Sequence, residues 1–385
     1  MVLFLHNRYR TTGGEERVVE DLLWLVREHL GEPAELLASD SVDLGRVRAA
    51  VGLLRGGLDP EEVACAVRDG GVRVVHAHNV NPAYGWRALA AARAAGARVV
   101  LHLHQYRLVC AVGVCFTGGE ECTRCHGRNT LPGALRNCRG SRSEAVAYAT
   151  SLALWQRRLV EQADAVIVPS VFARERLRAL GAPLDWGRVH VLPPPVRMAG
   201  ADGAAGGDVE NFATGGYALV VSRLSREKGV DVAVDACRIA GIPLVVAGDG
   251  PEAIALRERA GDGAVRFVGR VEGDALAGLR AGAALALVPS RSAETFGLAA
   301  AEAMAAGVPV VGSDVGALEE LLEPDALVPA GDAHALADAI ARVGRDEGAG
   351  ARGRARVDAL CAPQVVAGAL GEIYDEAVDR QESRL

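Results

Sequence analysis

Hydrophobic and polar positions follow two alternating patterns along this chain, one typical of strands and one typical of helices. Short apolar runs typical of buried strands occur at residues 2–5 (VLFL), 72–78 (VRVVHAH), 98–104 (RVVLHLH) and 165–170 (AVIVPS). The segments between them show helical spacing, as in residues 15–30, where the apolar positions are Val18, Val19, Leu22, Leu23, Val26 and Leu30. Such strand–helix alternation predicts right-handed βαβ units and a mostly parallel sheet.

The pattern stops at residues 193–216 and then starts again. A Pro-Pro-Pro-Val segment leads into a Gly- and Ala-rich stretch without periodicity. A second series of strand candidates follows, at residues 217–222, 243–248, 265–269, 283–290, 308–313 and 326–329. We therefore expect an α/β fold with two Rossmann-like, doubly wound domains facing each other across a cleft. The expected boundaries are an N-terminal domain at 1–196, a linker at 197–215, a C-terminal domain at 216–364 and a terminal helix at 365–385 packed back toward the first domain.

Composition and charge narrow the class of protein. A chain of 385 residues is too long to fold around a single hydrophobic core of ordinary size, so two domains are expected. Only 4% of its residues are aromatic. The net charge of −7 argues against nucleic acid as a partner. Residues 1–5 are too short for a signal-peptide core, and no run reaches the ~20 apolar residues of a membrane span. We expect a cytoplasmic protein, with attachment to the inner face of a membrane left open.

Two segments after strand candidates carry residues suited to phosphates. Gly13 and Gly14 directly precede a helix, whose N-terminus offers unpaired amides to an anion. The alternative is a tight turn in which Glu15 and Glu16 complement the helix dipole. In the second half, Arg223 and Lys228 follow a strand and could converge on a diphosphate, although surface cations at such positions are often only solvated.

Two glutamates stand in the apolar segment ETFGLAAAEAMAAGVPVV at residues 294–311. Glu294 should lie in a loop at the carboxyl edge of the sheet, with Thr295 capping a helix that begins near residue 296 or 297. Glu302 would then lie in a helix surrounded by alanines. Burying a carboxylate without a partner is costly, so we expect both to address one ligand; otherwise Glu294 is a solvated loop residue and Glu302 lies on an exposed face.

The segment PSRSAETFGLAAAEAMAAGVPVVGSDVGALEE at residues 289–320 resembles the signature of the retaining glycosyltransferases of family 4 (glycosyl transferases group 1, GT-B fold). Further matches run in order along nearly the whole chain: HNRYRTTGGEERVV at 6–19, HAHN at 76–79, HLHQYRLVC at 102–110, VSRLSREKGV at 221–230, AGDGPE at 247–252 and RFVGRV at 266–271. Departures occur at residues 194–197, where Asn-Gly-Val-Asp is common, and at Gln105, where aspartate is frequent.

The resemblance implies a role for each matching residue. Glu294 would contact the donor sugar and Glu302 the ribose of the nucleotide. Arg223 and Lys228 would bind the donor diphosphate, helped by the backbone at Phe296, Gly297 and Leu298, while Gly248 belongs to the donor-binding AGDGPE motif. Gly13 and Gly14 would approach the phosphates from the N-terminal, acceptor-binding domain, and His104 would lie near the reacting sugar carbon. His102 and His104 are expected to point to opposite faces of the sheet, one of them as a core histidine.

The reaction implied is transfer of a hexosyl unit from a UDP- or GDP-sugar to an unknown hydroxyl acceptor, with retention. No Asp-x-Asp triplet for a catalytic metal occurs in the sequence, so Arg223 and Lys228 would stabilise the leaving diphosphate. One alternative is a glycosidase that uses Glu294 and Glu302, but it leaves the glycine pair and the two cations without a purpose. A second alternative is a non-catalytic protein that binds sugar nucleotides on the same fold.

Five of the eight cysteines fall at residues 110–138. Cys110, Cys122, Cys125 and Cys138 could close a structural zinc site, and some members of the resembled family carry a comparable pattern. Cys115 stands outside this set, although it or His126 could replace one ligand. A reversible disulfide and plain free thiols are the alternatives. This cysteine-rich insert at 110–140 is also rich in arginine. Its positive charge could contact anionic lipid or an acidic acceptor; the alternative is a solvated loop.

Overall fold

The computed structural model describes residues 1–9, 13–197 and 216–382. Contacts divide the chain into two compact units: residues 1–117, 122–195 and 363–385 form the first, and residues 118–121 and 196–362 form the second. Of the linker expected at 197–215, all but Arg197 lies outside the described residues. No helix in the described ranges combines the length and the apolar character that a membrane crossing requires.

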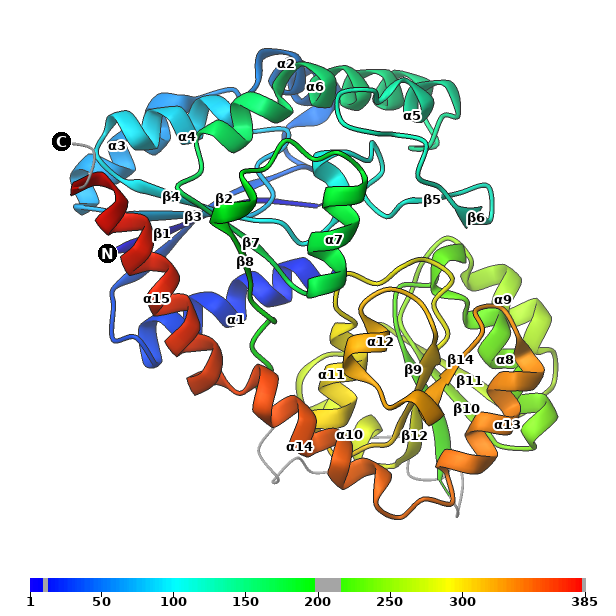
Figure 1. Cartoon of the computed structure of the whole chain (residues 1–385). Coiled ribbons are helices and arrows are strands. Elements are labelled where there is room, and N and C mark those ends of the chain that lie inside the picture. Colours follow the sequence, from blue (N-terminus) through cyan, green and yellow to red (C-terminus); the bar gives the residue numbers. More distant parts are fainter. Residues whose placement is uncertain (10–12, 198–215, 383–385) are drawn as a thin grey trace. The chain divides into compact units, whose positions relative to one another are not determined.

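The first unit contains a six-stranded parallel sheet (Figure 1). In spatial order its strands are β2 (Ala34–Asp40), β1 (Val2–Arg8), β3 (Val74–Ala77), β4 (Arg98–His102), β7 (Ala165–Val168) and β8 (Val189–Val191). Its helices are α1 (Gly14–Glu28), α2 (Gly45–Arg55), α3 (Pro60–Gly70), α4 (Gly85–Ala94), α5 (Leu131–Leu135), α6 (Arg142–Glu161), α7 (Val171–Ala179) and α15 (Pro363–Glu382), with 3₁₀ turns η1 (Tyr106–Leu108) and η2 (Trp186–Arg188). The central strands are buried on both faces, which explains their almost unbroken apolar runs.

The second unit repeats this architecture (Figure 1). Its strand order is β11 (Val265–Gly269), β10 (Leu244–Ala247), β9 (Tyr217–Val221), β12 (Ala283–Val288), β13 (Val310–Ser313) and β14 (Leu327–Val328), all parallel. The helices are α8 (Val230–Ala240), α9 (Ala253–Ala260), α10 (Gly273–Ala281), α11 (Leu298–Ala305), α12 (Leu318–Leu321), α13 (Ala333–Val343) and α14 (Ala349–Cys361), with 3₁₀ turns η3 (Arg226–Lys228) and η4 (Pro324–Ala326). The short strands β5 (Phe116–Thr117) and β6 (Glu120–Glu121) form a sheet of their own.

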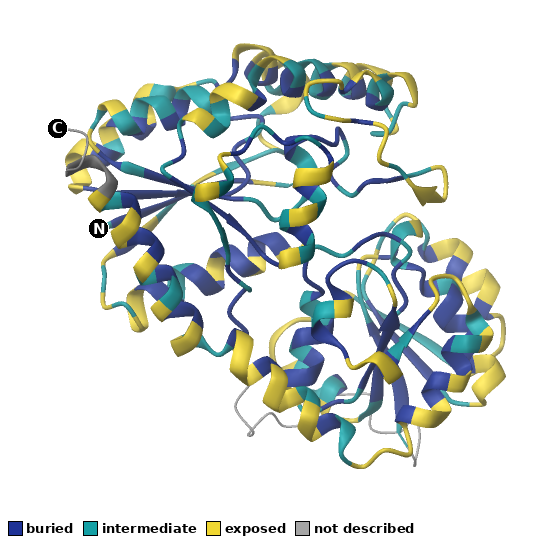
Figure 2. Cartoon of the chain, viewed as in Figure 1, coloured by how far each residue is buried: buried dark blue, intermediate teal, exposed yellow. Residues whose placement is uncertain are grey.

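The predicted α/β fold with two Rossmann-like parallel sheets is confirmed. In each unit the sheet forms the buried layer and the helices carry the exposed faces (Figure 2). The strand order reverses direction between β9 and β12 in the second unit and between β1 and β3 in the first. In sheets of this kind ligands bind beyond the carboxyl ends of the strands at such a reversal. Functional side chains are therefore expected at these two reversals of strand order.

Candidate functional site

At the strand-order reversal of the second unit, a lysine and a glutamate meet. Lys228 ends the 3₁₀ turn η3 that follows β9, and Glu294 lies in the loop that follows β12. The Lys228 Nζ is 2.6 Å from Glu294 Oε1, and the Ser290 hydroxyl donates to the same oxygen at 2.5 Å. The sequence predicted Lys228 and Glu294 as site residues, and the structure brings them together.

Glu294 is held in its charged form and in a fixed place. Burial alone would raise its pKa, but the Lys228 ammonium and the Ser290 hydroxyl hold the pKa below the usual range. The Glu294 backbone pairs with Gly316 in a parallel bridge, and its carbonyl accepts the Ala317 amide at 2.9 Å. Because both ends of the residue are tied, the carboxylate is preorganised rather than solvated.

Two glycines make the surrounding loops possible. Gly248 has φ +145°, and a Cβ there would lie 1.8 Å from the Ser222 carbonyl oxygen. Gly297 has φ +96°, and a Cβ there would lie 2.7 Å from a methyl carbon of Leu318. Gly297 is the N-cap of α11, which opens at Leu298. The sequence prediction that Thr295 caps this helix is wrong, because the turn through Gly297 separates Thr295 from the first helical residue.

The other predicted donor-site side chains have different partners. Arg223 is about half exposed, and its Nη2 lies 3.3 Å from Glu227 Oε1. Glu302 forms an ion pair with Arg280 of α10. Phe296 is buried beside Gly297. Among these contacts, neither Arg223 nor Glu302 touches the Lys228–Glu294 pair.

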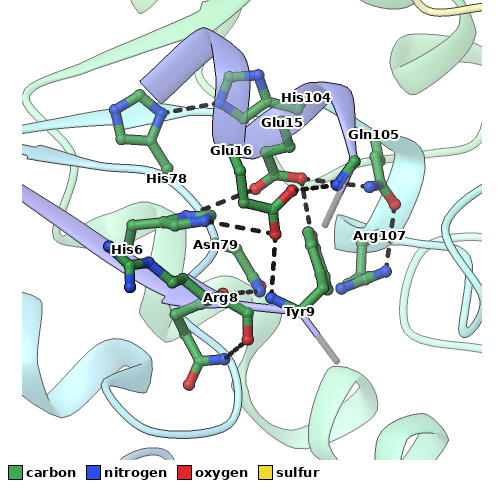
Figure 3. A network of polar contacts seen from close by, with 12 residues as sticks. His6, Arg8, Tyr9, Glu15, Glu16, His78, Asn79, His104, Gln105 and Arg107 are labelled. Carbon is green, nitrogen blue, oxygen red and sulfur yellow. Dashed lines mark hydrogen bonds and ion pairs between the residues drawn. The ribbon is translucent and has the colours of Figure 1, made fainter. Parts of the chain in front are cut away.

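At the reversal of the first unit, two acids from α1 surround a buried histidine (Figure 3). His6 on β1 is 1% exposed, with its ring nitrogens 3.9 Å from Glu15 Oε1 and from Glu16 Oε1. Glu16 accepts the Gly13 amide at 2.8 Å and the Tyr9 amide at 3.1 Å. Burial opposes but does not outweigh these contacts, which lower the pKa of Glu16. The Gly13 amide, predicted to meet an anion, is already used by this carboxylate.

A second layer of polar side chains joins this cluster (Figure 3). The Tyr9 hydroxyl donates to Glu15 Oε2 at 2.8 Å, and Gln105 Nε2 donates to the same oxygen at 3.2 Å. Arg107 donates to Gln105 Oε1 at 3.2 Å and lies 4.6 Å from the centre of the Tyr9 ring. Gln105 thus takes part in a hydrogen-bond network in which the aspartate frequent at this position could accept but not donate.

Four histidines form a buried stack behind this cluster. His78 Nδ1 is 2.8 Å from His104 Nε2, His76 Nε2 is 3.2 Å from His102 Nδ1, and Tyr374 of α15 reaches His76 Nδ1 at 2.7 Å. The rings of His102 and His104 lie 4.2 Å apart and 11° from parallel. The prediction that these two face opposite sides is wrong, because side chains two positions apart along an extended segment lie on the same side.

The stack stays neutral because it is buried. Desolvation, reinforced by the neighbouring imidazoles, lowers the pKa of His76 to about 3 and holds the pKa of His78 and of His102 well below the usual value. The pKa of His104 is also lowered by burial, with Glu15 opposing. Each ring in the stack is therefore an uncharged donor and acceptor at neutral pH.

The geometry of the stacked histidines does not suit a metal ion. Where three metal-ligating atoms of the described residues lie within 4.8 Å of one another, they belong to His76, His78 and His102. Their rings are stacked within 11° to 27° of parallel, so their in-plane lone pairs do not converge. Both nitrogens of His76 also have partners in Tyr374 and His102. The trio is therefore a packing and hydrogen-bonding unit rather than a metal site.

The cysteine insert gathers its thiols around one small cavity. It is lined by Cys110, Cys115, Cys122, Cys125 and Cys138. Cys115, left outside the predicted ligand set, lies with the others, and its hydrogen bond to Cys110 lowers the Cys110 pKa to about 6 against the effect of burial. All eight cysteines are free. Their sulfurs form no group of three within 4.8 Å among the described residues, whereas tetrahedral zinc needs ~3.8 Å between sulfurs.

Comparison with known proteins identifies the family to which this chain belongs. Residues 3–195 match the glycosyl transferase 4-like domain, and residues 215–346 match glycosyl transferases group 1. The first match alone covers half of the chain. The chain belongs to the glycosyl transferase 4-like family.

Relatives of this family member differ in how far they align. A GDP-mannose-dependent alpha-(1-6)-phosphatidylinositol dimannoside mannosyltransferase of Mycobacterium tuberculosis is 34% identical over 213 residues, which cover 50% of this chain and 54% of that protein. The chain thus spans about half the length of the curated relatives it matches. Sucrose-phosphate synthase of Thermosynechococcus elongatus superposes with a TM-score of 0.70 at 22% identity, covering 97% and 98% of the two chains. HepE of Anabaena, in complex with UDP and glucose, gives 0.63 at 18% identity, covering 96% and 98%.

Several residues of this family member were missed by the sequence prediction as site residues. They are His6, Tyr9, Glu15, Glu16, His78, Arg107, Glu227, Arg280, Ser290 and Tyr374. Only a few left a signal. His6 is a polar residue inside an apolar strand, and Glu15 and Glu16 follow a glycine pair directly, a position that also fits a helix dipole. Arg280 and Tyr374 lie in helices far along the chain, so their contacts depend on packing that no local pattern encodes.

Proposed function

We propose that this protein is a retaining glycosyltransferase that moves a hexosyl unit from a UDP- or GDP-sugar to a hydroxyl acceptor. The observation that carries the proposal is the contact between Lys228 and Glu294 at the strand-order reversal of the second unit. A cation and a carboxylate held together there fit a ligand that carries both phosphate and hydroxyl groups. Family membership and the UDP complex of HepE support the same assignment.

Each donor-site residue is assigned a task. Lys228 is placed at the donor diphosphate as a point charge, with two ammonium protons left after its contact to Glu294. Arg223, half exposed at the end of β9, joins it by turning away from Glu227. Glu294 accepts from the sugar hydroxyls, Glu302 accepts from the ribose hydroxyls, and the amides at the start of α11 face the phosphates. Gly248 and Gly297 keep the backbone close to the ligand.

The proposed chemistry needs no protein nucleophile. As the bond to the sugar carbon breaks, negative charge grows on the leaving diphosphate, and Lys228 and Arg223 stabilise it in place of a metal ion. The acceptor hydroxyl attacks from the same face, and the departing phosphate takes its proton, so the configuration is retained. His104, which is neutral and anchored by His78, is assigned to the neighbourhood of the reacting carbon.

The test is a screen of purified UDP- and GDP-sugars for thermal stabilisation and for release of the nucleoside diphosphate. A donor that both stabilises the protein and releases its nucleotide in the presence of a hydroxyl acceptor supports the proposal. Activity that persists in EDTA supports metal-independent catalysis, and the anomeric configuration of the product reports on retention. Binding without release over a range of acceptors would favour the non-catalytic sugar-nucleotide protein instead. The biological setting proposed is the synthesis of a glycoconjugate, a polysaccharide or a glycosylated metabolite.

We also propose that the cysteine insert holds a structural zinc ion. The five thiols that line one cavity are the donors that zinc prefers, and the ion would draw Cys110, Cys122, Cys125 and Cys138 together. Zinc would then stabilise a loop with little secondary structure of its own. Metal analysis of protein purified without oxygen should find about one zinc per chain; a content near zero would remove this proposal.

Contact with a membrane surface is proposed for the region around this insert. Large apolar side chains are exposed on α2, α5 and α6, and α6 packs against both other helices. The exposed side chains are Val47, Val51, Leu54, Leu131, Leu135, Val146 and Leu154. Arg46 and Arg55 stand on α2, and Arg136 directly follows α5. Exposed apolar side chains on packed helices that also carry arginines fit an interface with anionic lipid.

A further inference from the structure

Arg280 and Glu302 form an ion pair within the second unit. Arg280 lies in the last turn of α10, and its Nη2 donates to Oε2 of Glu302 on α11. The Arg280 side chain is 11% exposed and that of Glu302 is 16% exposed. The sequence assigned Glu302 to the nucleotide and assigned nothing to Arg280.

The geometry of this ion pair is less favourable for stability than that of another ion pair in the same unit. Arg291 and Asp231, in the same unit, make two parallel contacts of 2.6 Å each. Arg280 makes one contact to Glu302, and its buried Nε has no hydrogen-bond partner among the described residues. A bidentate pair would be stronger and would satisfy more donors. Since a buried donor without a partner needs an explanation, stability alone does not account for this arrangement.

The single contact leaves half of the carboxylate available. Within the described parts of the chain, no hydrogen bond is recorded to Glu302 Oε1, while Oε2 is held by Arg280. A glutamate side chain has three rotatable bonds, and fixing it before a ligand arrives removes an ordering cost from binding. The surroundings of Glu302 on α11 are buried alanines, which offer no other polar anchor.

We propose that Arg280 is the positioning residue that aims the Glu302 carboxylate at the ribose diol of the donor nucleotide. This inference rests on the proposed function, in which Glu302 accepts from the ribose hydroxyls. Arg280 itself acts through Glu302 rather than by touching the sugar. Its contribution should therefore exist only when the ligand carries ribose hydroxyls.

The experiment compares ligands with and without the diol. Dissociation constants of UDP, GDP and their 2′,3′-dideoxy forms are measured by calorimetry for the full chain and for Arg280→Met, Arg280→Lys and Glu302→Gln. Arg280→Met should raise the dissociation constant of the nucleotide that binds by about tenfold, since one charge-assisted hydrogen bond is lost. The dissociation constant of the dideoxy form should stay unchanged. Arg280→Lys should keep most of the affinity that Arg280→Met loses, because a single contact to Glu302 needs only one charged donor.

A control variant and distinct outcomes keep the test decisive. Arg352→Gln breaks an exposed ion pair with Glu323 in the same unit and should change neither constant. An equal loss for both forms of the ligand after Arg280→Met would show a merely structural role and overturn the proposal. No loss for either form would also overturn it, while Glu302→Gln can still show its own ribose-dependent effect. If Glu302→Gln also fails to distinguish the two ligands, the assignment of Glu302 to ribose in the proposed function falls instead.

Discussion

At the scale of single residues, the groups proposed to bind the donor are charged side chains held by specific partners. Lys228 and Glu294 hold each other, and Ser290 adds a third contact at Glu294. This pair is partly buried, so truncating one member leaves the other charge incompletely compensated, and the effect exceeds the value of the pair itself. Variants at this position therefore need a readout of folding beside the readout of activity.

Lys228→Ala should reduce sugar transfer at least a hundredfold. The reason is the loss of a fixed charge beside the leaving diphosphate, where such electrostatic groups are worth about 10²–10³ in rate. The measurement is nucleoside diphosphate release at saturating donor, with thermal unfolding as the check on folding. Arg226→Ala is a matched control in the same turn, because Arg226 is exposed and pairs with Glu252. Unchanged turnover in Lys228→Ala would contradict the assignment.

At the scale of elements, most strands could be predicted from sequence and most contacts could not. The central strands are buried on both faces, so their apolar runs are nearly continuous, as in residues 2–5. The edge strands β2 and β8 escaped prediction because they are only partly buried and lack such runs. The start of α11 was misplaced because Gly297 adopts a left-handed conformation, so the helix opens only at Leu298; a side chain at position 297 would also collide with Leu318.

The candidate site was predictable to the same extent. Lys228 and Glu294 could be assigned because each lies in the segment that follows a recognisable strand, and the carboxyl ends of parallel strands meet at one edge of a sheet. Arg280 could not, because an ion pair between two helices is set by packing rather than by spacing. Ser290 and Glu227 each lie four residues from their partner, but in segments outside the α-helices, where this spacing does not by itself predict a contact. The histidine stack was hidden for a further reason: its members come from two separate segments, at the ends of β3 and β4, and converge only in the folded sheet.

The histidine stack predicts a dependence of stability on pH. The pKa of His76 falls to about 3 in the folded protein from an ordinary value near 6.5. Below pH 6.5 the unfolded chain therefore takes up a proton that the folded chain refuses, and the free energy of unfolding falls as the pH drops. The expected slope is about 1.4 kcal/mol per pH unit for each such histidine.

Denaturant unfolding between pH 7.5 and 5 checks this slope. His76→Gln should flatten it by about one proton, whereas His334→Asn, at an exposed position in the second unit, should leave the part of the slope due to the stack unchanged. A free energy of unfolding that does not vary over this range would contradict the description of the stack as buried and neutral.

At the scale of the whole molecule, α15 completes the first unit from the far end of the chain. Tyr374→Phe removes the partner of His76 Nδ1 and should lower the free energy of unfolding by about 1–3 kcal/mol, the cost of leaving one buried polar group unsatisfied. Tyr217→Phe is the matched control, because it removes a buried 2.7 Å hydrogen bond to Leu279 in the second unit. Site-resolved hydrogen exchange should place the first loss among β3 and β4 and the second among β9 and α10.

The exposed apolar surface on α2, α5 and α6 predicts binding to anionic vesicles. Val47→Glu with Leu135→Glu should weaken binding to phosphatidylglycerol-containing vesicles by tenfold or more, since each apolar side chain inserted is worth roughly 1.5 kcal/mol or more. Ile254→Glu replaces a similarly exposed side chain on α9 and should have no effect. Equal binding by all three proteins in vesicle sedimentation would place the contact elsewhere or remove it.

The return of α15 to the first unit also fixes an order of events during synthesis. The ribosome must finish the whole second unit before residues 363–385 emerge and the first unit is complete. Until then the nascent first unit lacks Tyr374, and Nδ1 of the buried His76 lacks its hydrogen-bond partner. The first unit thus stays incomplete until α15 has been made, a period in which chaperones have access to an unfinished sheet.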